Sequence, residues 1–531
     1  MSVESRGGGR WAHGRRESTE VEDFQSGMIA EPLLAFGGGH AHVDPKTGLA
    51  LYGPYTISGQ VRPSLSSIIV GAVGPSNMVA DTIRWLQSCQ FPLHNDGEQP
   101  FLYPEFPGFN AQHPFQCDIV VGDVWRETID HSLREALRLP QFFERISAVI
   151  DAYVVAIEVL AQREPVPNVV LCCMPQEVVD LCTVHVTKGG EVRRRKRSAG
   201  EKRASKTAQS GQQFLFSEFD PSASIDEVPW SHENLRRGLK ARCMRLGLPT
   251  QLVWPRTITR PLSNTGKAAS QDVATKAWNF TTALYYKAGG TPWRLAEAES
   301  GVCFVGIAFY RELSERGHLL RTAMAQAFTS SGDGYVIRGN TFEWDPDKDG
   351  RTPHLNADSA AGLLRQVLEL YRRQNRGADP RRLVIHKSSR FSEGELLGFR
   401  QASQSIPRAD YLAIGNRGIQ FFRSGLYPAL RGTYVRFSQT NQLLYTMGYM
   451  PYLRTYPGAR VPQPIEILEH HGDGAWDTNL GEILGLTKMN WNSADFAGSM
   501  PVTLAFARKV GQVLAEMPPG TKPREEFRFY M

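Results

Sequence analysis

The stretch GVCFVGIAFYREL, residues 301–313, is a nearly continuous apolar run that predicts a long buried strand. The strand pattern continues in YVIRGNTFEWD at 335–345. It is followed by the helical pattern of SAAGLLRQVLELYRRQN at 359–375 and by a further apolar run, RRLVIHKSS, at 381–389. Successive strands followed by a helix and another strand indicate one sheet that begins with antiparallel neighbours. We therefore expect the second half of the chain to be an α/β domain built around residues 301–313.

Upstream of residue 300, strand and helix patterns alternate. A helical pattern at 76–89 follows the first predicted strand, and HENLRRGLK at 232–240 precedes the last one. This alternation is typical of a parallel, doubly wound sheet, in which ligands bind at the carboxyl ends of the strands. The predicted strands are SSIIVGAV (66–73), CDIVVGD (117–123), PNVVLCCMP (167–175) and LPTQLVW (248–254).

The composition is that of a globular protein. The chain has 531 residues, enough for two compact domains, and 41% of them are hydrophobic. No apolar run reaches the ~18 residues of a membrane span, and the N-terminus lacks the apolar core of a secretory signal, so we expect a cytoplasmic location. Seven cysteines, several of them inside apolar strands, favour reduced thiols over a disulfide framework or a zinc site.

Charge is unevenly distributed along the chain. The net charge of +6 is too small to establish a polyanionic partner. Residues 188–206, however, contain nine Lys or Arg and only two Glu, which is too like-charged to pack. We predict a basic disordered loop over 188–212 that can touch phosphates, and a disordered tail over residues 1–22.

Three side chains before residue 260 are suited to binding a phosphate. Arg236 and Lys240 are four apart, so on a helix they point the same way and can converge on one anion. The doubly wound arrangement brings Gln251, on the last predicted strand, to the same crevice. A guanidinium, an ammonium and an amide offer different donors to the phosphate oxygens. An isolated pair of this kind is also typical of a solvated helix face, and that alternative stays open.

These segments resemble, in order, the MID and PIWI domains of prokaryotic Argonautes. The resemblance spans about residues 30–531 and implies an N-terminal segment and Rossmann-like MID domain, placed together at 23–290, followed by an RNase H-like PIWI domain at 291–531. EPLLAFGGGHAHVDPKTGLALYGPY, residues 31–55, resembles the start of the short Argonautes, which lack separate N-terminal and PAZ domains. The other matching segments are HENLRRGLKARCM (232–244), LPTQLVW (248–254), ATKAWNFTTALYYKAGGTPWRL (274–295), LVIHKSSRFSEGEL (383–396) and LTKMNWNSADFAGSMPVTLAFA (486–507).

The resemblance implies a pocket for the 5′-terminal phosphate of a guide strand. The spacing of Arg236, Lys240, Gln251 and Lys276 matches that of MID pockets. In many relatives a divalent cation links the guide phosphates to the carboxylate at the chain's own C-terminus. We therefore expect Mg²⁺ between Gln251 and the Met531 carboxylate, with EEFRFYM running as a strand into the core.

The resemblance also implies that the nuclease centre is lost. Active PIWI domains hold metal ions with several carboxylates. Here Ala308 and Ser388 stand at two of those positions, and Asn490 and Asn492 lie near a third. Neither Ala nor Ser can replace a carboxylate ligand of a hard cation, so we predict that the chain is not an enzyme. The first alternative is a guide-dependent nuclease with a displaced metal site, for which the candidate carboxylates are Glu343, Asp345 and Asp347.

The resemblance finally suggests a guide-directed sensor. We expect a 5′-phosphorylated guide, RNA in our hypothesis, to pair with single-stranded DNA of an invading plasmid or phage, with the duplex gripped through its backbone. Target recognition would activate a separate APAZ-domain effector in a heterodimer, a TIR or sirtuin-like NADase or else a nuclease. A second alternative is a scaffold protein that binds no guide. The candidate backbone contacts are Arg294, Arg390, Lys488 and Asn490.

Overall fold

The computed structural model describes most of the chain. The predicted tail at 1–22 lies outside the described residues, as does most of the predicted loop at 188–212, of which only Val192–Arg193 (β9) is described, paired with His185–Val186 (β8). The described ranges are 24–55, 65–95, 99–112, 114–182, 185–186, 192–193, 234–258, 272–297, 299–313, 319–329, 334–344, 352–415, 418–421, 428–437, 441–458, 461–518 and 520–531.

The first lobe is built on a parallel sheet. Its described strands are β4 (Ser67–Gly74), β5 (Asp118–Val120), β6 (Arg126–Thr128), β7 (Val169–Cys173) and β10 (Thr250–Val253). They run in the order β10-β7-β4-β5, with β6 pairing the end of β4, and every pairing is parallel. This confirms the doubly wound arrangement that the sequence predicts.

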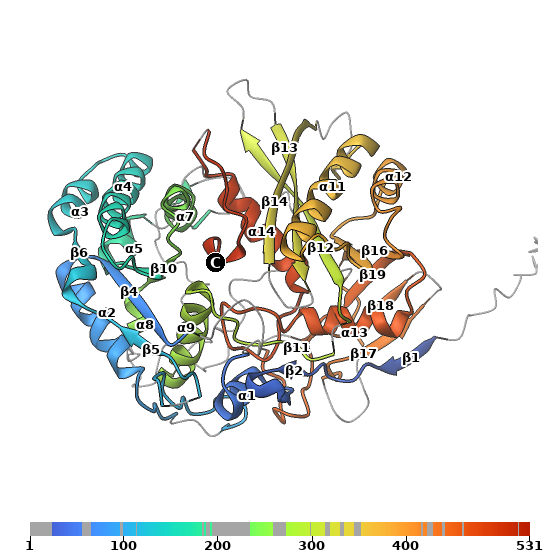
Figure 1. Ribbon diagram of the computed structural model, residues 1–531, viewed down its shortest axis with the longest axis horizontal. Helices are drawn as coiled ribbons and strands as arrows, with labels where there is room; N and C mark the ends of the chain where they lie inside the picture. Colours follow the sequence, from blue (N-terminus) through green and yellow to red (C-terminus); the bar gives the residue numbers. More distant parts are fainter. Residues whose placement is uncertain are drawn as a thin grey trace, which may run out of the picture.

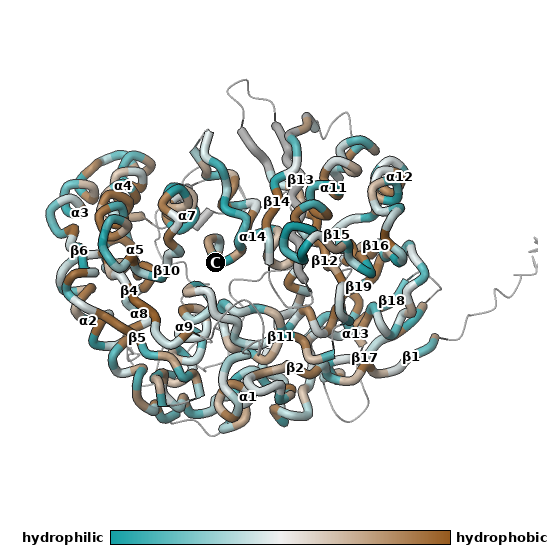
Figure 2. Tube along the Cα trace, viewed as in Figure 1, coloured by the Kyte–Doolittle hydropathy of each residue, from teal (hydrophilic) through white to brown (hydrophobic). Residues whose placement is uncertain are grey.

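Helices cover both faces of this sheet (Figure 1). They are α2 (Ser76–Ser88), α3 (Asp130–Leu137), α4 (Phe142–Ala161), α5 (Gln176–Cys182), α7 (Leu235–Cys243), α8 (Pro255–Ile258) and α9 (Val273–Lys287). Because side chains alternate along a strand, Val170 and Cys172 pack with α4 and α7, whereas Val169 and Leu171 pack with α2 and α9. Figure 2 shows the hydrophobic residues of α4 and β4 in this interior.

The second lobe is built on a mixed sheet. Its nine described strands are β1 (Gln25–Met28), β12 (Val302–Leu313), β13 (Leu319–Thr329), β14 (Gly334–Glu343), β15 (Arg382–Lys387), β16 (Arg408–Gly415), β17 (Thr433–Arg436), β18 (Gln442–Leu444) and β19 (Ile465–His471). They lie in the order β1-β17-β18-β19-β16-β15-β12-β13-β14. The predicted long strand, β12, pairs antiparallel with β13 and parallel with β15, as the order of patterns after residue 300 predicts.

The helices of the second lobe divide between the two faces of its sheet. They are α11 (Ala357–Gln374), α12 (Glu393–Ala402), α13 (Trp476–Leu486) and α14 (Val502–Leu514). The cores place α11 and α12 on one face and α13 and α14 on the other. The start of α14 lies so close to β12 that a Cβ at Gly306 would be 2.0 Å from the Thr503 carbonyl oxygen. None of the described helices has the length and hydropathy needed to cross a bilayer.

The N-terminal residues connect the two lobes. β1 pairs with β17, so residues 25–28 of the N-terminal segment join the sheet of the second lobe. The chain then forms β2 (Leu34–Ala35) and β3 (Ala41–His42), which form a small sheet with β11 (Arg294–Leu295). Next comes α1 (Pro45–Tyr52), whose first turn is capped by the Asp44 carboxylate.

A buried ionic cluster anchors this N-terminal segment. Glu31 accepts hydrogen bonds from Arg431 Nε at 2.8 Å and from Lys488 Nζ at 2.8 Å. The side chains of Arg431 and Lys488 are fully buried. Although burial of Glu31 opposes it, the attraction of these two cations holds the pKa of the carboxyl below its usual range.

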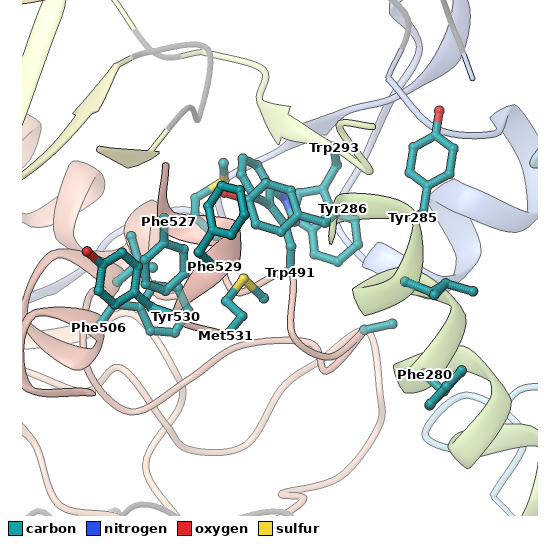
Figure 3. Packing of buried hydrophobic residues seen from close by; sticks show 14 of the residues in the cluster. Phe280, Tyr285, Tyr286, Trp293, Trp491, Phe506, Phe527, Phe529, Tyr530 and Met531 are labelled. Atoms are coloured by element: carbon teal, nitrogen blue, oxygen red, sulfur yellow. The ribbon is translucent and has the colours of Figure 1, made fainter. Parts of the chain in front are cut away.

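The C-terminus packs into a core shared by both lobes (Figure 3). Phe527, Phe529, Tyr530 and Met531 are each at most 5% exposed. The predicted strand forms a single bridge, between Glu526 and Tyr335, and then turns into a 3₁₀ helix, η4 (Phe527–Phe529). A strand would send alternate side chains to opposite faces, whereas the turn lets these apolar residues all enter one core.

We predict that Lys488→Met destabilises the protein by about 3 kcal/mol, because it breaks a buried ion pair. It also removes the donor to two backbone carbonyls, those of Pro32 and Val43. A lower midpoint of thermal unfolding would show this. The control is Arg390→Gln, which removes a half-exposed partner of Glu469 and should change stability by less than about 1 kcal/mol. Equal midpoints for the two variants would contradict the anchoring role of Lys488.

Candidate nucleic-acid interface

Two capped helices position the predicted phosphate-binding residues. The Asn234 side chain accepts hydrogen bonds from the backbone N–H groups of Arg236 and Arg237 and so starts α7. The Asp272 carboxylate accepts one from Thr275 N at 2.8 Å and starts α9. Arg236 and Lys240, one turn apart on α7, therefore project from the same side of the helix.

Three cationic side chains and one amide meet between α7, β10 and α9. Lys240 is 2% exposed, and its Nζ donates to the Thr250 carbonyl oxygen at 3.0 Å. Lys287 is 1% exposed and donates to Gln251 Oε1. We call Arg236, Lys240, Gln251 and Lys287 the cation cluster. Both ammonium groups bind neutral oxygens, and within the described chain neither forms an ion pair.

The pKa values of these lysines are lowered because burial disfavours their charged forms. Burial, together with repulsion by the Arg236 guanidinium, lowers the pKa of Lys240 to about 7. Burial and the repulsion of Lys240 and Arg236 hold the pKa of Lys287 well below its usual value. Cations with lowered pKa values and neutral partners are stabilised by an anion placed among them. The cluster is therefore a candidate anion site.

Lys276, the fourth residue predicted for the pocket, lies elsewhere on α9. Its Nζ donates to the Arg256 carbonyl oxygen at 2.7 Å. It precedes Lys287 by three helical turns, a rise of about 16 Å. The structure thus brings together Arg236, Lys240 and Gln251 as predicted, but the lysine that joins them is Lys287. Sequence reasoning missed it, although a lysine at the end of the apolar run TTALYYK, just before Gly289-Gly290, was a usable signal.

Gln251, one of the two predicted Mg²⁺ ligands, does not fit a metal ion in this arrangement. Gln251 Oε1, the atom that would bind the cation, accepts a hydrogen bond from Lys287. A divalent ion there would have to displace that ammonium and would be repelled by Arg236 and Lys240. The Lys287 ammonium already provides positive charge at this point.

The two positions predicted to lack carboxylates are neighbours in the second lobe. Ile307 of β12 lies opposite Lys387 of β15, so Ala308 and Ser388 follow at the same end of adjacent strands. The carboxylate of Glu395 reaches this end, where it accepts hydrogen bonds from Lys387 Nζ at 2.6 and 2.8 Å. In the part of the chain that the structure covers, no group of three or more His, Cys, Asp or Glu is placed to hold a metal.

The structure does not describe the side chains of the three carboxylates that were the candidates for a displaced metal site. Glu343 ends β14, and its side chain is not described. Asp345 and Asp347 lie outside the described residues.

The candidate backbone contacts fall into different environments. Lys488 must be reassigned: its three ammonium hydrogens serve Glu31, Pro32 and Val43, and none is left for a phosphate. The Arg294 guanidinium lies 4.1 Å from the centre of the Tyr55 ring. Arg390, half exposed, pairs with Glu469 at 3.2 Å.

Asn490 lines a cavity at the junction of the two lobes. The cavity has a volume of about 310 Å³. Across this junction, Asn279 Oδ1 of α9 accepts a hydrogen bond from Ala494 N at 2.9 Å. Burial raises the pKa of the Asp495 carboxyl, which also lines the cavity. We call this space the junction cavity, and its polar lining includes Asp44, Thr275, Asn279, Asn490, Asn492 and Asp495.

We predict that the stability of the ligand-free protein rises with pH between about 7 and 10. The pKa of Lys240 is about 7 in the folded chain and about 10.4 unfolded, so the unfolded chain binds more protons in this window. Thermal unfolding midpoints measured across the window should therefore increase. Lys240→Met should be more stable than the wild type at pH 7 and have a shallower slope. The same slope in Lys240→Met and wild type would count against the cluster.

No protein-family model matches the chain, and no curated protein sequence does. Among solved structures, it is similar to Clostridium butyricum Argonaute bound to a guide DNA and a 19-mer target DNA, with 15% identity and a TM-score of 0.59 over 96% of this chain and 55% of that one. It is also similar to Aa-Ago with externally bound siRNA, with 15% identity and a TM-score of 0.55 over 95% of this chain and 56% of that one. The chain spans about half the length of these proteins. The predicted fold, a doubly wound α/β lobe followed by an RNase H-like lobe as in the MID and PIWI domains of these structures, is thereby confirmed.

Proposed function

We propose that the chain binds a guide strand by its 5′-terminal phosphate in the cation cluster. The observation that carries this proposal is the burial of Lys240 and Lys287 against neutral oxygens. A terminal phosphate carries between one and two negative charges near pH 7 and offers three acceptor oxygens. It would supply the counter-charge that these ammonium groups lack, in a site that excludes water.

Each side chain of the cluster has a distinct part in this binding. Arg236 offers a planar fork to two oxygens, and the two lysines act as point charges. Gln251 holds the Lys287 ammonium through Oε1 and so positions it. The 5′ phosphate is thereby distinguished from a 5′ hydroxyl, which carries no charge to offset the burial of the cations.

Helix α9 gives the guide a path from the cluster into the junction cavity. Lys287 at its last turn belongs to the cluster, and Thr275 and Asn279 near its start line the cavity. Asn490 and Asn492 face the same cavity from the second lobe. Amide side chains can bind phosphate and sugar oxygens without reading bases, so sequence recognition is left to pairing with a target strand.

We further propose that the chain recognises its target without cleaving it. Ala308 and Ser388 lie side by side at the strand ends where a two-metal nuclease needs carboxylates. The resemblance of residues 31–55 to short Argonautes supports an RNA guide and a single-stranded DNA target from a plasmid or phage. It also supports a role in defence through a separate APAZ-domain effector, of NADase or nuclease type, that pairing activates.

We expect Lys287→Gln to weaken binding of a 5′-phosphorylated oligonucleotide by about 10- to 100-fold, since one charged hydrogen bond is lost. Lys276→Gln is the matched control on the same helix, and it should bind within about 3-fold of the wild type. Fluorescence anisotropy with labelled RNA and DNA of one sequence, each with a 5′ phosphate or a 5′ hydroxyl, measures this. Equal affinity for the phosphate and hydroxyl forms would refute the proposal.

The purified chain, loaded with a guide, should leave a complementary DNA strand intact in the presence of Mg²⁺ or Mn²⁺. Gel analysis of an end-labelled target tests this, and guide-dependent cleavage would favour the displaced nuclease site instead.

Adding the protein that co-purifies with the tagged chain should produce an effector activity, with NAD consumption as the first activity to assay, only when the target matches the guide. Activity independent of the target would contradict the proposed activation.

A further inference from the structure

The junction cavity contains a buried lysine with few hydrogen-bond partners. Lys46, in the first turn of α1, lines the cavity and is 5% exposed. Its Nζ donates one long hydrogen bond, of 3.4 Å, to the Leu102 carbonyl oxygen, and within the described ranges it forms no ion pair. The helix dipole favours anions at this end of α1, so it does not stabilise the ammonium. Lys46 therefore has donors left for a ligand.

A carboxyl group from the second lobe lines the same cavity. Asp495 lies between α13 and α14, and its side chain hydrogen-bonds with Ser493. Its Oδ1 is nevertheless buried without a hydrogen-bond partner. Burial raises the pKa of this carboxyl and so favours its neutral form, although the attraction of Lys46 opposes the shift. A buried acceptor of this kind is unfavourable until a ligand donates to it.

Two contacts of α9 fix the walls of the cavity around these groups. Trp278 Nε1 donates, at 3.1 Å, to a backbone carbonyl of the loop that carries Tyr103. Asn279 Oδ1 accepts from Ala494 N at 2.9 Å and so holds the loop of the second lobe. The Nδ2 group of Asn279 has no acceptor in the described part of the chain, which makes it a second donor for a ligand.

The mixture of charges limits what this cavity can bind. A phosphate would be repelled by the Asp44 carboxylate and offers no donor to Asp495, and a metal ion would be repelled by the Lys46 ammonium. An amino acid would need Asp495 in its charged form, which burial disfavours. A neutral molecule with acceptors beside a donor fits all of these groups. The rings of Tyr103 and Phe506 also line the cavity and can contact the face of a flat ring.

We propose that the junction cavity binds an unpaired guanine base. Guanine has two neighbouring acceptors, O6 and N7, for Lys46 and Asn279, and it has ring and amino N–H groups for Asp495 Oδ1. Adenine has an amino donor in place of O6, and the pyrimidines lack N7. The cavity volume of about 310 Å³ is at the lower end of the range for small-molecule sites, which suits a base or a nucleoside.

None of these side chains belongs to the cation cluster, so the site goes beyond the proposed function. A free guanine nucleoside or a base of a bound strand can supply the ring, and both present the same edges to the cavity. Tyr103 and Ser493 are partly exposed, so the cavity is accessible from solvent. In a bound strand this contact would read one base, whereas Asn490 and Asn492 would still contact only the backbone.

The first experiment measures binding of the four nucleosides to the full chain by calorimetry. A nucleoside has no phosphate, so it offers no charge to the cation cluster. We expect guanosine to bind about 10-fold more tightly than the others. Asp495→Leu, which keeps the size but removes the acceptor, and Lys46→Met should each reduce guanosine affinity about 10-fold. The control, Asp477→Leu, changes an exposed carboxylate of α13 and should bind guanosine as the wild type does.

The second experiment asks whether a strand supplies the base. 5′-Phosphorylated oligouridines, each with one guanosine at a different position, are compared with the all-uridine strand by fluorescence anisotropy. A preference of about 10-fold for one of them, lost in Lys46→Met, would identify a strand base. Guanosine binding without such a preference would identify the free nucleoside. Lys46→Met should fold, because it removes a buried charge that has no counter-charge within ion-pair distance in the described chain.

Two results would overturn the proposal. One is the absence of any preference for guanine, both among the nucleosides and among the strands. The other is a guanine preference that survives in both Lys46→Met and Asp495→Leu, which would place the base elsewhere. Failure of every phosphorylated strand to bind, with guanosine still bound through Lys46 and Asp495, would instead refute the proposed function and leave this site standing.

Discussion

The burial of like charges in the cation cluster is the constraint on which the rest of the structure depends. Lys240 and Lys287 are almost fully buried, repel each other and Arg236, and have neutral oxygens as their hydrogen-bond partners. Such an arrangement opposes folding, and the core shared by the two lobes must offset it. The C-terminal residues Phe527 to Met531 contribute to that core directly beside α9 (Figure 3). A protein with no anion to bind would gain stability by losing these lysines.

Several other buried cations of this chain are paired differently from those of the cluster. Arg382 is held by Asp410 and Glu482, Lys387 by Glu395, and Lys488 by Glu31. Each of these groups has a carboxylate partner from another element, as buried charges in proteins generally do. Their pairing joins segments far apart in the sequence and leaves little capacity for a ligand. The pairing with Glu31 gives Lys488 a structural role in place of the phosphate contact that the sequence predicts.

The sequence predicted the main helices and strands, but it did not predict all of the elements and side chains that they contact. Apolar periodicity located β4, β7, β10, β12 and α11, because burial on one or both faces leaves a local pattern. The pairing of β1 with β17 depends on residues about 400 positions apart, which no local pattern records. Lys276 and Lys287 lie on one helix, and only the packing of α9 against β10 shows which of them reaches Gln251. The alternating apolar residues at the C-terminus predicted a strand. Periodicity alone does not show that the apolar side chains there all enter one core, which is why the 3₁₀ helix was missed.

A related electrostatic argument applies to the cation cluster and to the ends of β12 and β15. A divalent ion could neutralise phosphate at the cluster, but the Lys287 ammonium occupies the Gln251 oxygen that would bind it. Carboxylates at positions 308 and 388 would repel a nucleic acid backbone unless metal ions compensated them, and Ala308 and Ser388 remove that repulsion. In the proposed function, side-chain cations offset the phosphate charge and no carboxylate at those positions needs neutralising. Binding then depends on the ionisation of Lys240 and its neighbours, which links guide affinity to pH through the cluster itself.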